Sequence, residues 1–213
     1  RWRKFPVGYY VTDRGVDAVS SQQFQTPISR AFGKWDAVET AELSSQFAGF
    51  TQQSPGGDDD LSVLGFLSRP DQGRTLAATC FFIGNKDGRI LESDIFFNST
   101  FPWSVSDAGI AGRFDIESIG VHEIGHFFGL SDSALGETEL ISGGRRVIAA
   151  ESVMFPIAFS AGNTSDRELK ADDIAGSSDT YPNAKFRGER GSVSGRVTKN
   201  GRGESAILAR YLD

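Results

Sequence analysis

The stretch HEIGHFFGLSD, residues 122–132, contains both histidines of this 213-residue chain. His122 and His126 stand four positions apart, so on an α-helix they are separated by about 40° and one turn, and their imidazoles converge. Two converging neutral imidazoles are a typical pair of Zn²⁺ ligands. Glu123 can reach a water on such a metal without being a ligand itself. The spacing therefore predicts a zinc site for hydrolysis, with Glu123 as general base.

A third protein ligand is expected where the chain turns back after this helix. Gly129 permits the turn because glycine adopts positive φ without steric cost. Asp132 then has the right place, and carboxylate oxygen is an acceptable zinc ligand. Two alternatives stay open: Asp132 is a solvated loop residue, or the ligand comes from Glu137 or Glu139. Three protein ligands leave a fourth position for water, as in catalytic zinc sites.

The composition is that of a soluble globular domain with room for a buried core. Hydrophobic residues make up 38% of the chain and charged residues 23%, and the length suits one good-sized domain. A net charge of −6 argues against nucleic acid or an acidic membrane surface as partner. No apolar run approaches the roughly 20 residues of a membrane span. The single cysteine, Cys80, excludes an intramolecular disulfide, and we expect it in the core.

The elements that must position this site are a mixture of strands and helices. A hydroxyl followed by proline predicts that one helix begins at Thr26-Pro27, and Asp115 is predicted to cap the helix that carries the histidines. A further helix is expected over 170–180, and a hairpin turning at Gly143-Gly144 within residues 133–153. Alternation and turn residues predict strands over 5–12, 44–51, 61–67, 75–83 and 90–98.

Six stretches, in this order, resemble the matrixins, a family of metzincin zinc metalloproteases: AFGKW, LAAT, SDIFFN, HEIGHFFGLSDS, SVMFP and LKADDIAGSSDTYP. The resemblance covers residues 2 to 182. It implies an α/β (α+β) catalytic domain with a twisted mixed sheet, a zinc-site helix, a Met turn and a C-terminal helix. Met154 matches the methionine of that turn, and Asp173 the helix aspartate that supports it. Asp132 replaces the usual third histidine, a variant that also occurs in snapalysin-like metzincins.

The resemblance implies a zinc endopeptidase with one catalytic Zn²⁺. LAAT carries alanine where the family often has a histidine for a second, structural zinc, so that ion is expected to be absent. The substrate is expected to be a protein or peptide that binds in extended form along the sheet edge at Ala77 and Ala78. The residues expected to bound the S1′ pocket are Ser118, Ile119, Phe155 and Phe159. A secreted or extracytoplasmic monomer is expected.

Two alternatives to this function are kept. One is a snapalysin-like or other metzincin with the same chemistry and a different specificity. The other is an inactive zinc-binding module. Retention of Glu123 favours an active enzyme, since a degenerate site commonly loses its general base.

Two further predictions concern calcium and domain organisation. Asp58, Asp59 and Asp60 could help bind Ca²⁺, as could Asp94 and Asn98, although a solvated acidic loop is the favoured interpretation. A composition change places the catalytic domain at residues 1–188. Residues 189–213 are expected to form a C-terminal β-hairpin extension that resembles the start of a carboxypeptidase-regulatory-like module. The alternative is a hairpin that packs on the catalytic domain.

Overall fold

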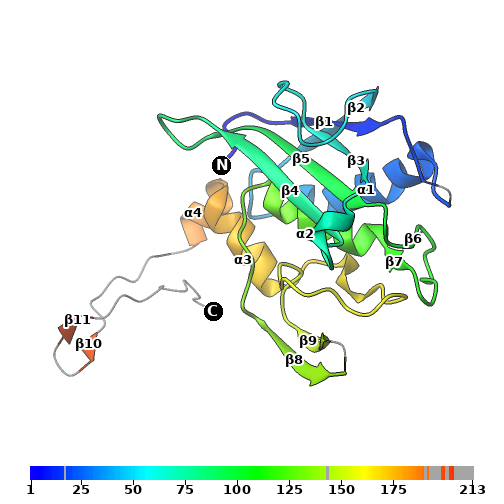
Figure 1. Cartoon of the computed structure of the whole chain (residues 1–213). Helices are drawn as coiled ribbons and strands as arrows, with labels where there is room; N and C mark the ends of the chain where they lie inside the picture. Colours follow the sequence, from blue (N-terminus) through cyan, green and yellow to red (C-terminus); the bar gives the residue numbers. More distant parts are fainter. Residues whose placement is uncertain (17, 143, 190, 192–197, 200–201, 204–213) are drawn as a thin grey trace.

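The computed structural model describes residues 1–16, 18–142, 144–189, 191, 198–199 and 202–203. Its centre is a five-stranded mixed sheet with the strand order β2-β1-β3-β5-β4. Helices α1 and α2 pack against each other beside this sheet (Figure 1). The strands of the sheet are β1 Val7–Thr12, β2 Ser45–Thr51, β3 Val63–Leu67, β4 Ala77–Ile83 and β5 Ile90–Asn98.

The remaining elements are helices, 3-10 turns and short strands outside the five-stranded sheet. The helices are α1 Ser21–Asp36, α2 Ile116–Phe127, α3 Ala171–Thr180 and α4 Ala184–Glu189, with 3-10 turns η1 Pro70–Gln72 and η2 Ser165–Arg167. The short strands are β6 Trp103–Ser104, β7 Phe114–Asp115, β8 Gly136–Ile141, β9 Gly144–Ala150, β10 Thr198–Lys199 and β11 Arg202–Gly203. The expected mixed α/β architecture is confirmed, and each of the five strands of the sheet falls within a range predicted from the sequence.

Strand β4 forms one edge of the sheet and runs antiparallel to β5, whereas the other neighbours in the sheet pair in parallel. The register of β4 pairs Ala77 with Phe97 and Ile83 with Ile90. An edge strand keeps one row of backbone N–H and C=O groups unpaired within its sheet. This edge is therefore available to an added strand.

The core between the sheet and the two long helices is largely aromatic. Phe32 stacks on Tyr9 with ring centroids 4.0 Å apart, and Phe24 contacts Phe97 edge to face at 5.0 Å. The fully buried Trp35 donates its indole N–H to the carbonyl oxygen of Val121 at 2.9 Å. This packing holds α2 against the sheet, because large rings fill the interface. The indole hydrogen bond fixes the position of α2 relative to α1.

The prediction that the first helix begins at Thr26-Pro27 was wrong. Helix α1 begins at Ser21, and Pro27 lies buried inside it. The physical reason is a capping box: Ser20 Oγ accepts from the Gln23 backbone N–H, and the Gln23 side chain accepts from the Ser20 N–H. Two orphan amide donors are satisfied at once in this way, which fixes the start of the helix upstream of the proline.

The expected core position of Cys80 was also wrong, because the residue is exposed. Cys80 lies in the second half of β4, where Phe81 and Ile83 are also exposed, by 47% and 50%. As an edge strand, β4 has no neighbour on its outer side. A strand at an edge is covered less completely than a central strand, so mid-strand position alone does not bury a side chain.

The inserted hairpin and the C-terminal helix are confirmed. Strands β8 and β9 pair antiparallel, with Ile141 opposite Gly144 at the tip, and α3 falls within the predicted range. Most of residues 189–213 lie outside the described residues, apart from Glu189, Gly191 and the β10–β11 pair. The boundary near 188 and the nature of the extension therefore stay predictions. Within the described part of the chain, no helix combines the length and hydrophobicity of a membrane span.

Candidate active site

Helix α2 carries both histidines, and its two ends are fixed by local interactions. Asp115 caps the start, accepting from the Ser118 backbone N–H at 2.9 Å and from its hydroxyl at 2.8 Å. At the other end, Gly129 has φ +87°, and its N–H donates to the His126 carbonyl oxygen. The left-handed turn at Gly129 sends the chain back toward the helix, and Asp132 follows three residues later.

The side chains of His122, His126 and Asp132 converge, and they are the cluster of three metal-ligating groups that the described residues contain. The two Nε2 atoms lie 3.1 Å apart. Asp132 Oδ1 lies 3.8 Å from Nε2 of His122 and 3.4 Å from Nε2 of His126. The other candidates for a third ligand, Glu137 and Glu139, lie on β8 and are not part of this cluster.

The hydrogen bonds of the two imidazoles favour the tautomer in which Nε2 is the free nitrogen of the neutral ring. Nδ1 of His122 lies 2.8 Å from the Val153 carbonyl oxygen, and Nδ1 of His126 lies 2.8 Å from the Leu130 carbonyl oxygen. A carbonyl only accepts, so each neutral ring keeps its proton on Nδ1 and presents the Nε2 lone pair to the cluster. Two such lone pairs directed at one point suit a metal cation bound between them.

The residues present fit Zn²⁺. Tetrahedral coordination with bonds of 2.0–2.1 Å places ligand atoms roughly 3.3 Å apart, close to the three separations in this cluster. Each histidine also has the carbonyl partner that orients ligating imidazoles in zinc proteins. The Asp132 side chain is 55% exposed, which leaves the fourth side of the cluster open to solvent.

Glu123 lies at the floor of the cleft and is held by a residue that sequence analysis missed. Thr79, on β4, donates its hydroxyl to Glu123 Oε2 at 2.6 Å and lies 3.0 Å from the Glu123 carbonyl oxygen. Burial raises the pKa of the Glu123 carboxyl above its ordinary value, while the Thr79 hydrogen bond opposes that rise. A raised pKa suits a carboxylate that must accept a proton from water and later release it. The sequence signal available was the polar residue that ends LAAT.

The turn at Met154 packs directly beneath the histidines. The Met154 side chain is buried, and a Cβ added at Gly125 would lie 2.2 Å from its sulfur. The Asp173 carboxylate accepts from the Ser152 hydroxyl at 2.5 Å and from the Val153 N–H at 2.9 Å. The same loop supplies the carbonyl that orients His122. Asp173, the Met turn and the first histidine thus form one connected network.

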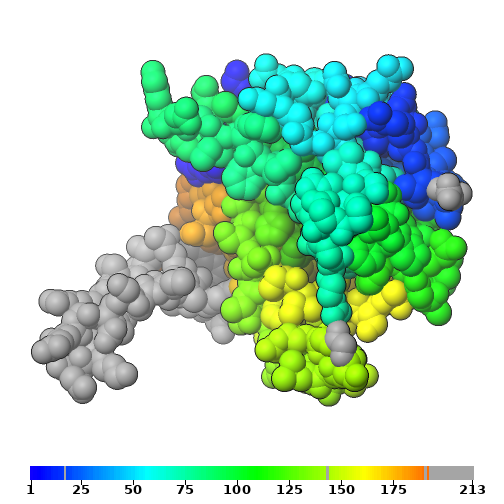
Figure 2. Space-filling model, in the orientation of Figure 1, coloured from blue at the N-terminus to red at the C-terminus, as the bar shows by residue number. Residues whose placement is uncertain are grey.

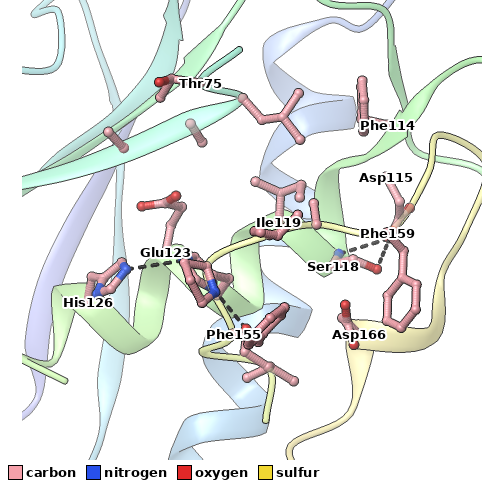
Figure 3. Close-up of a pocket in the computed structure, with 18 of the residues that line it drawn as sticks. Thr75, Phe114, Asp115, Ser118, Ile119, Glu123, His126, Phe155, Phe159 and Asp166 are labelled. Carbon is pink, nitrogen blue, oxygen red and sulfur yellow. Dashed lines mark hydrogen bonds between the residues drawn. The ribbon is translucent and has the colours of Figure 1, made fainter. Parts of the chain in front are cut away.

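A cavity of about 800 Å³ opens beside these groups, between β4 and the segment that follows the Met turn. Figure 3 shows Ser118, Ile119 and Glu123 on α2 facing this space, with Phe155 and Phe159 opposite. The lining also includes Ala77 and Ala78, so the structure brings all of the sequence-predicted substrate-binding residues to one cavity. The phenyl groups give its lower wall an apolar character.

The residues predicted for calcium do not all converge. The Asn98 side chain is used within the fold, where it donates to the carbonyl oxygens of Arg69 and Thr75 and accepts from the Arg69 N–H. Asp94 is buried and accepts from the Val63 N–H at 2.7 Å. Beside it lies Glu92, which is 2% exposed and whose Oε1 has no hydrogen-bond partner among the described residues.

The fold and the site together define the catalytic domain of a metallopeptidase. The family model for the matrixins matches residues 1–182, and the chain therefore belongs to the matrixin family of zinc-dependent metalloendopeptidases. Metalloendoproteinase 1 from Glycine max is 30% identical over 128 residues, which cover 52% of this chain and 35% of that protein. The match thus spans about a third of the length of this relative.

Proposed function

We propose that this chain is an endopeptidase in which His122, His126 and Asp132 hold a single catalytic Zn²⁺ and Glu123 is the general base. The observation that carries the proposal is the convergence of three ligand atoms beside a buried carboxylate, at the floor of a cleft lined by an edge strand. The retained base argues against the inactive zinc-binding module. A snapalysin-like specificity remains the alternative within the same chemistry.

The chain's own residues supply binding, orientation and proton transfer. An extended peptide adds to the edge of β4, where the free backbone groups beside Ala77 and Ala78 fix its position. Its P1′ side chain enters the apolar cavity between Ile119 and Phe159. Bound Zn²⁺ would acidify water and polarise the scissile carbonyl. Glu123 accepts the proton of the attacking water and delivers it to the leaving amine nitrogen.

The test of this proposal separates the base from the ligands. Glu123→Ala should retain zinc in metal analysis and lose peptide cleavage, because the three ligands are unchanged. Asp132→Ala should lose most of its zinc affinity, and Asp132→His should bind zinc again because imidazole is also a ligand. Equal zinc binding by Asp132→Ala and the parent would refute the ligand assignment. Full cleavage by zinc-loaded Glu123→Ala would refute the role of the base.

Secretion, the monomeric state and a calcium site belong to this proposal as predictions drawn from the family resemblance and the sequence. The calcium prediction is supported at one point: the unpartnered Glu92 oxygen lies near Asp94 and accepts through its other oxygen from the Asp59 N–H at 3.2 Å. Carboxylate and backbone oxygens are the ligands that Ca²⁺ prefers. Calcium at this place would stabilise the fold rather than take part in the reaction.

A further inference from the structure

One end of the catalytic cleft is bounded by two arginines from opposite walls. Arg74 precedes β4 on the upper wall, and Arg145 lies on β9 of the inserted hairpin; both line the cavity. The two walls touch, since a Cβ at Gly144 would lie 2.4 Å from Nη1 of Arg74. Figure 2 shows the segment between β3 and β4 reaching down the front of the molecule to this hairpin.

The contacts of α2 show which end of the cleft this is. Gly129, after the helix, lies against Ile90, and Gly120, in its first half, lies against Phe97. Because β4 pairs Ala77 with Phe97 and Ile83 with Ile90, the start of β4 lies over the first half of α2. This is also the side of Ser118 and Ile119, which line the P1′ cavity.

A substrate whose P1′ side chain enters that cavity therefore runs antiparallel to β4. Thr79 lies at Glu123, beside the scissile bond, and the residues after P1′ pass Leu76 and Thr75 toward Arg74. With about 3.3 Å per residue in an extended chain, P2′ and P3′ reach the place where Arg74 meets the hairpin tip.

The two neighbouring arginines of the hairpin face opposite ways. Arg146 forms an ion pair with Glu139, its partner across the hairpin. Arg145 donates to the Thr138 hydroxyl at 2.8 Å and, among the described residues, has no carboxylate within 4.0 Å. Val147 lies two residues after Arg145, on the same face of the strand, and is 7% exposed, whereas Leu140, which pairs with Arg145, is 78% exposed. The face that carries Arg145 therefore turns inward at Val147 and is open near the tip.

The carboxylates elsewhere in the cleft are already engaged. Asp115 is paired with Arg167 at 2.7 Å, and Asp166 with Lys170 at 2.8 Å. Glu123 is hydrogen-bonded to Thr79, and Asp132 belongs to the ligand cluster. Arg145 is thus a lining cation whose charge no described carboxylate in the cleft neutralises.

We infer that Arg145 forms, with Arg74 opposite, a subsite for a substrate carboxylate at P2′ or P3′. The inference rests on the proposed endopeptidase function and adds a specificity-determining residue to it. The carboxylate can belong to an Asp or Glu side chain or to the C-terminus of a peptide that ends at this position. A guanidinium matches either group, since its N–H donors form a fork that fits two carboxylate oxygens.

The test compares matched peptides that carry either Glu or Gln at P2′ or at P3′. A third pair carries Glu or Gln at P3, on the other side of the scissile bond, as a control. The parent is expected to cleave the P2′ or P3′ Glu peptide about fivefold more efficiently in kcat/KM than its Gln partner, a ratio typical of a partly exposed charge pair. Arg145→Gln should bring the ratio close to one, through a lower kcat/KM for the Glu peptide. Arg145→Glu should reverse the preference in favour of Lys.

Arg146→Gln is the control, because it removes the same charge from the outward face of the same strand. It should keep the Glu preference. The inference would be overturned if Arg145→Gln and Arg146→Gln lost the preference for Glu equally, or if Arg145→Gln did not change the Glu to Gln ratio of kcat/KM. Neither the parent nor the variants should prefer Glu over Gln at P3.

Peptides that end at P2′ or P3′ with a free or an amidated C-terminus distinguish the two sources of the carboxylate. A preference for the free acid that Arg145→Gln abolishes assigns the subsite to chain ends, and a preference confined to internal Glu assigns it to side chains. The same pairs are titrated against the Glu123→Ala variant, where binding is measured without cleavage. An Arg145-dependent preference in binding supports the subsite even if the parent cleaves none of the peptides, and its absence there counts against the subsite alone.

Discussion

At the scale of single residues, the site depends on hydrogen bonds that orient its side chains. Nδ1 of both histidines is taken up by backbone carbonyls, so Nε2 is the nitrogen presented to a metal. Glu123 is fixed in the same manner by the Thr79 hydroxyl. Because the Glu123 side chain is buried, one hydrogen bond decides where its carboxylate points.

Thr79 is therefore expected to be a positioning residue for Glu123, the proposed general base. Thr79→Val keeps the shape of the side chain and removes the hydroxyl, which leaves the buried Glu123 oxygen unpaired. We expect kcat to fall by about tenfold or more, consistent with the roughly 1.4 kcal/mol per decade of rate, with little change in KM. Thr79→Ser should restore most of the activity. Steady-state kinetics on one peptide decide this, and a rise in KM at constant kcat would show that Thr79 binds substrate instead.

At the scale of elements, α2 and the turn at Met154 pack so closely that a Cβ at Gly125 would overlap the Met154 side chain. Gly125 lies between the histidines in sequence, and its Cβ position is 2.2 Å from the Met154 sulfur and 2.9 Å from Trp35. The glycine in HEIGH is therefore a packing requirement, since a protein interior at crystal-like density has no room for an extra methyl group. The same turn orients His122 through Val153.

Gly125→Ala should destabilise the fold by about 1–3 kcal/mol through overpacking and weaken zinc binding, because the Met turn must move away from His122. Gly33→Ala is the matched control. Gly33 is also helical, in α1, and an added Cβ there meets nothing within 4 Å. That variant should gain roughly 0.5–1 kcal/mol from helix propensity. Denaturant unfolding and zinc titration of both variants test the difference, and equal stability changes would contradict it.

At the scale of the whole molecule, stability depends on pH through a buried acidic pair away from the catalytic cleft. Burial raises the pKa of both Glu92 and Asp94 above their ordinary values. Like-charge repulsion from Asp94 adds to the rise at Glu92, and repulsion from Asp59 adds to the rise at Asp94. When the pKa of a carboxyl is higher in the folded than in the unfolded state, its protonation adds to the free energy of unfolding at low pH. This contribution is lost as the pH rises through the folded-state pKa.

Glu92→Gln should therefore be more stable than the parent at pH 7 by about 1 kcal/mol, the cost of burying an unpartnered charged oxygen in place of a neutral one. The advantage should shrink as the pH falls toward 4, where the parent carboxyl is protonated. Thermal unfolding across this range measures it. If the calcium prediction holds, added Ca²⁺ should raise the Tm of the parent and not that of Glu92→Gln. A variant less stable than the parent at every pH would refute the electrostatic argument.

The sequence by itself determined those features that follow from local spacing. The four-residue separation of His122 and His126 places them on one helical face, and Gly129 returns the chain so that Asp132 can reach them, because neither depends on distant contacts. The five strands and the inserted hairpin followed from alternation and turn residues for the same reason. The start of α1 is also local, because Ser20 and Gln23 form the capping box, whereas Thr26-Pro27 lies inside the helix.

Only the tertiary structure decided which residues meet from distant parts of the chain. Thr79 lies beside Glu123. Cys80 is exposed because β4 is an edge strand. Arg145 lines the cleft because the hairpin folds back toward β4. Strand order and the faces of a hairpin are set by packing between segments far apart in sequence. A one-residue change of register would exchange the faces of Arg145 and Arg146 without changing any local preference.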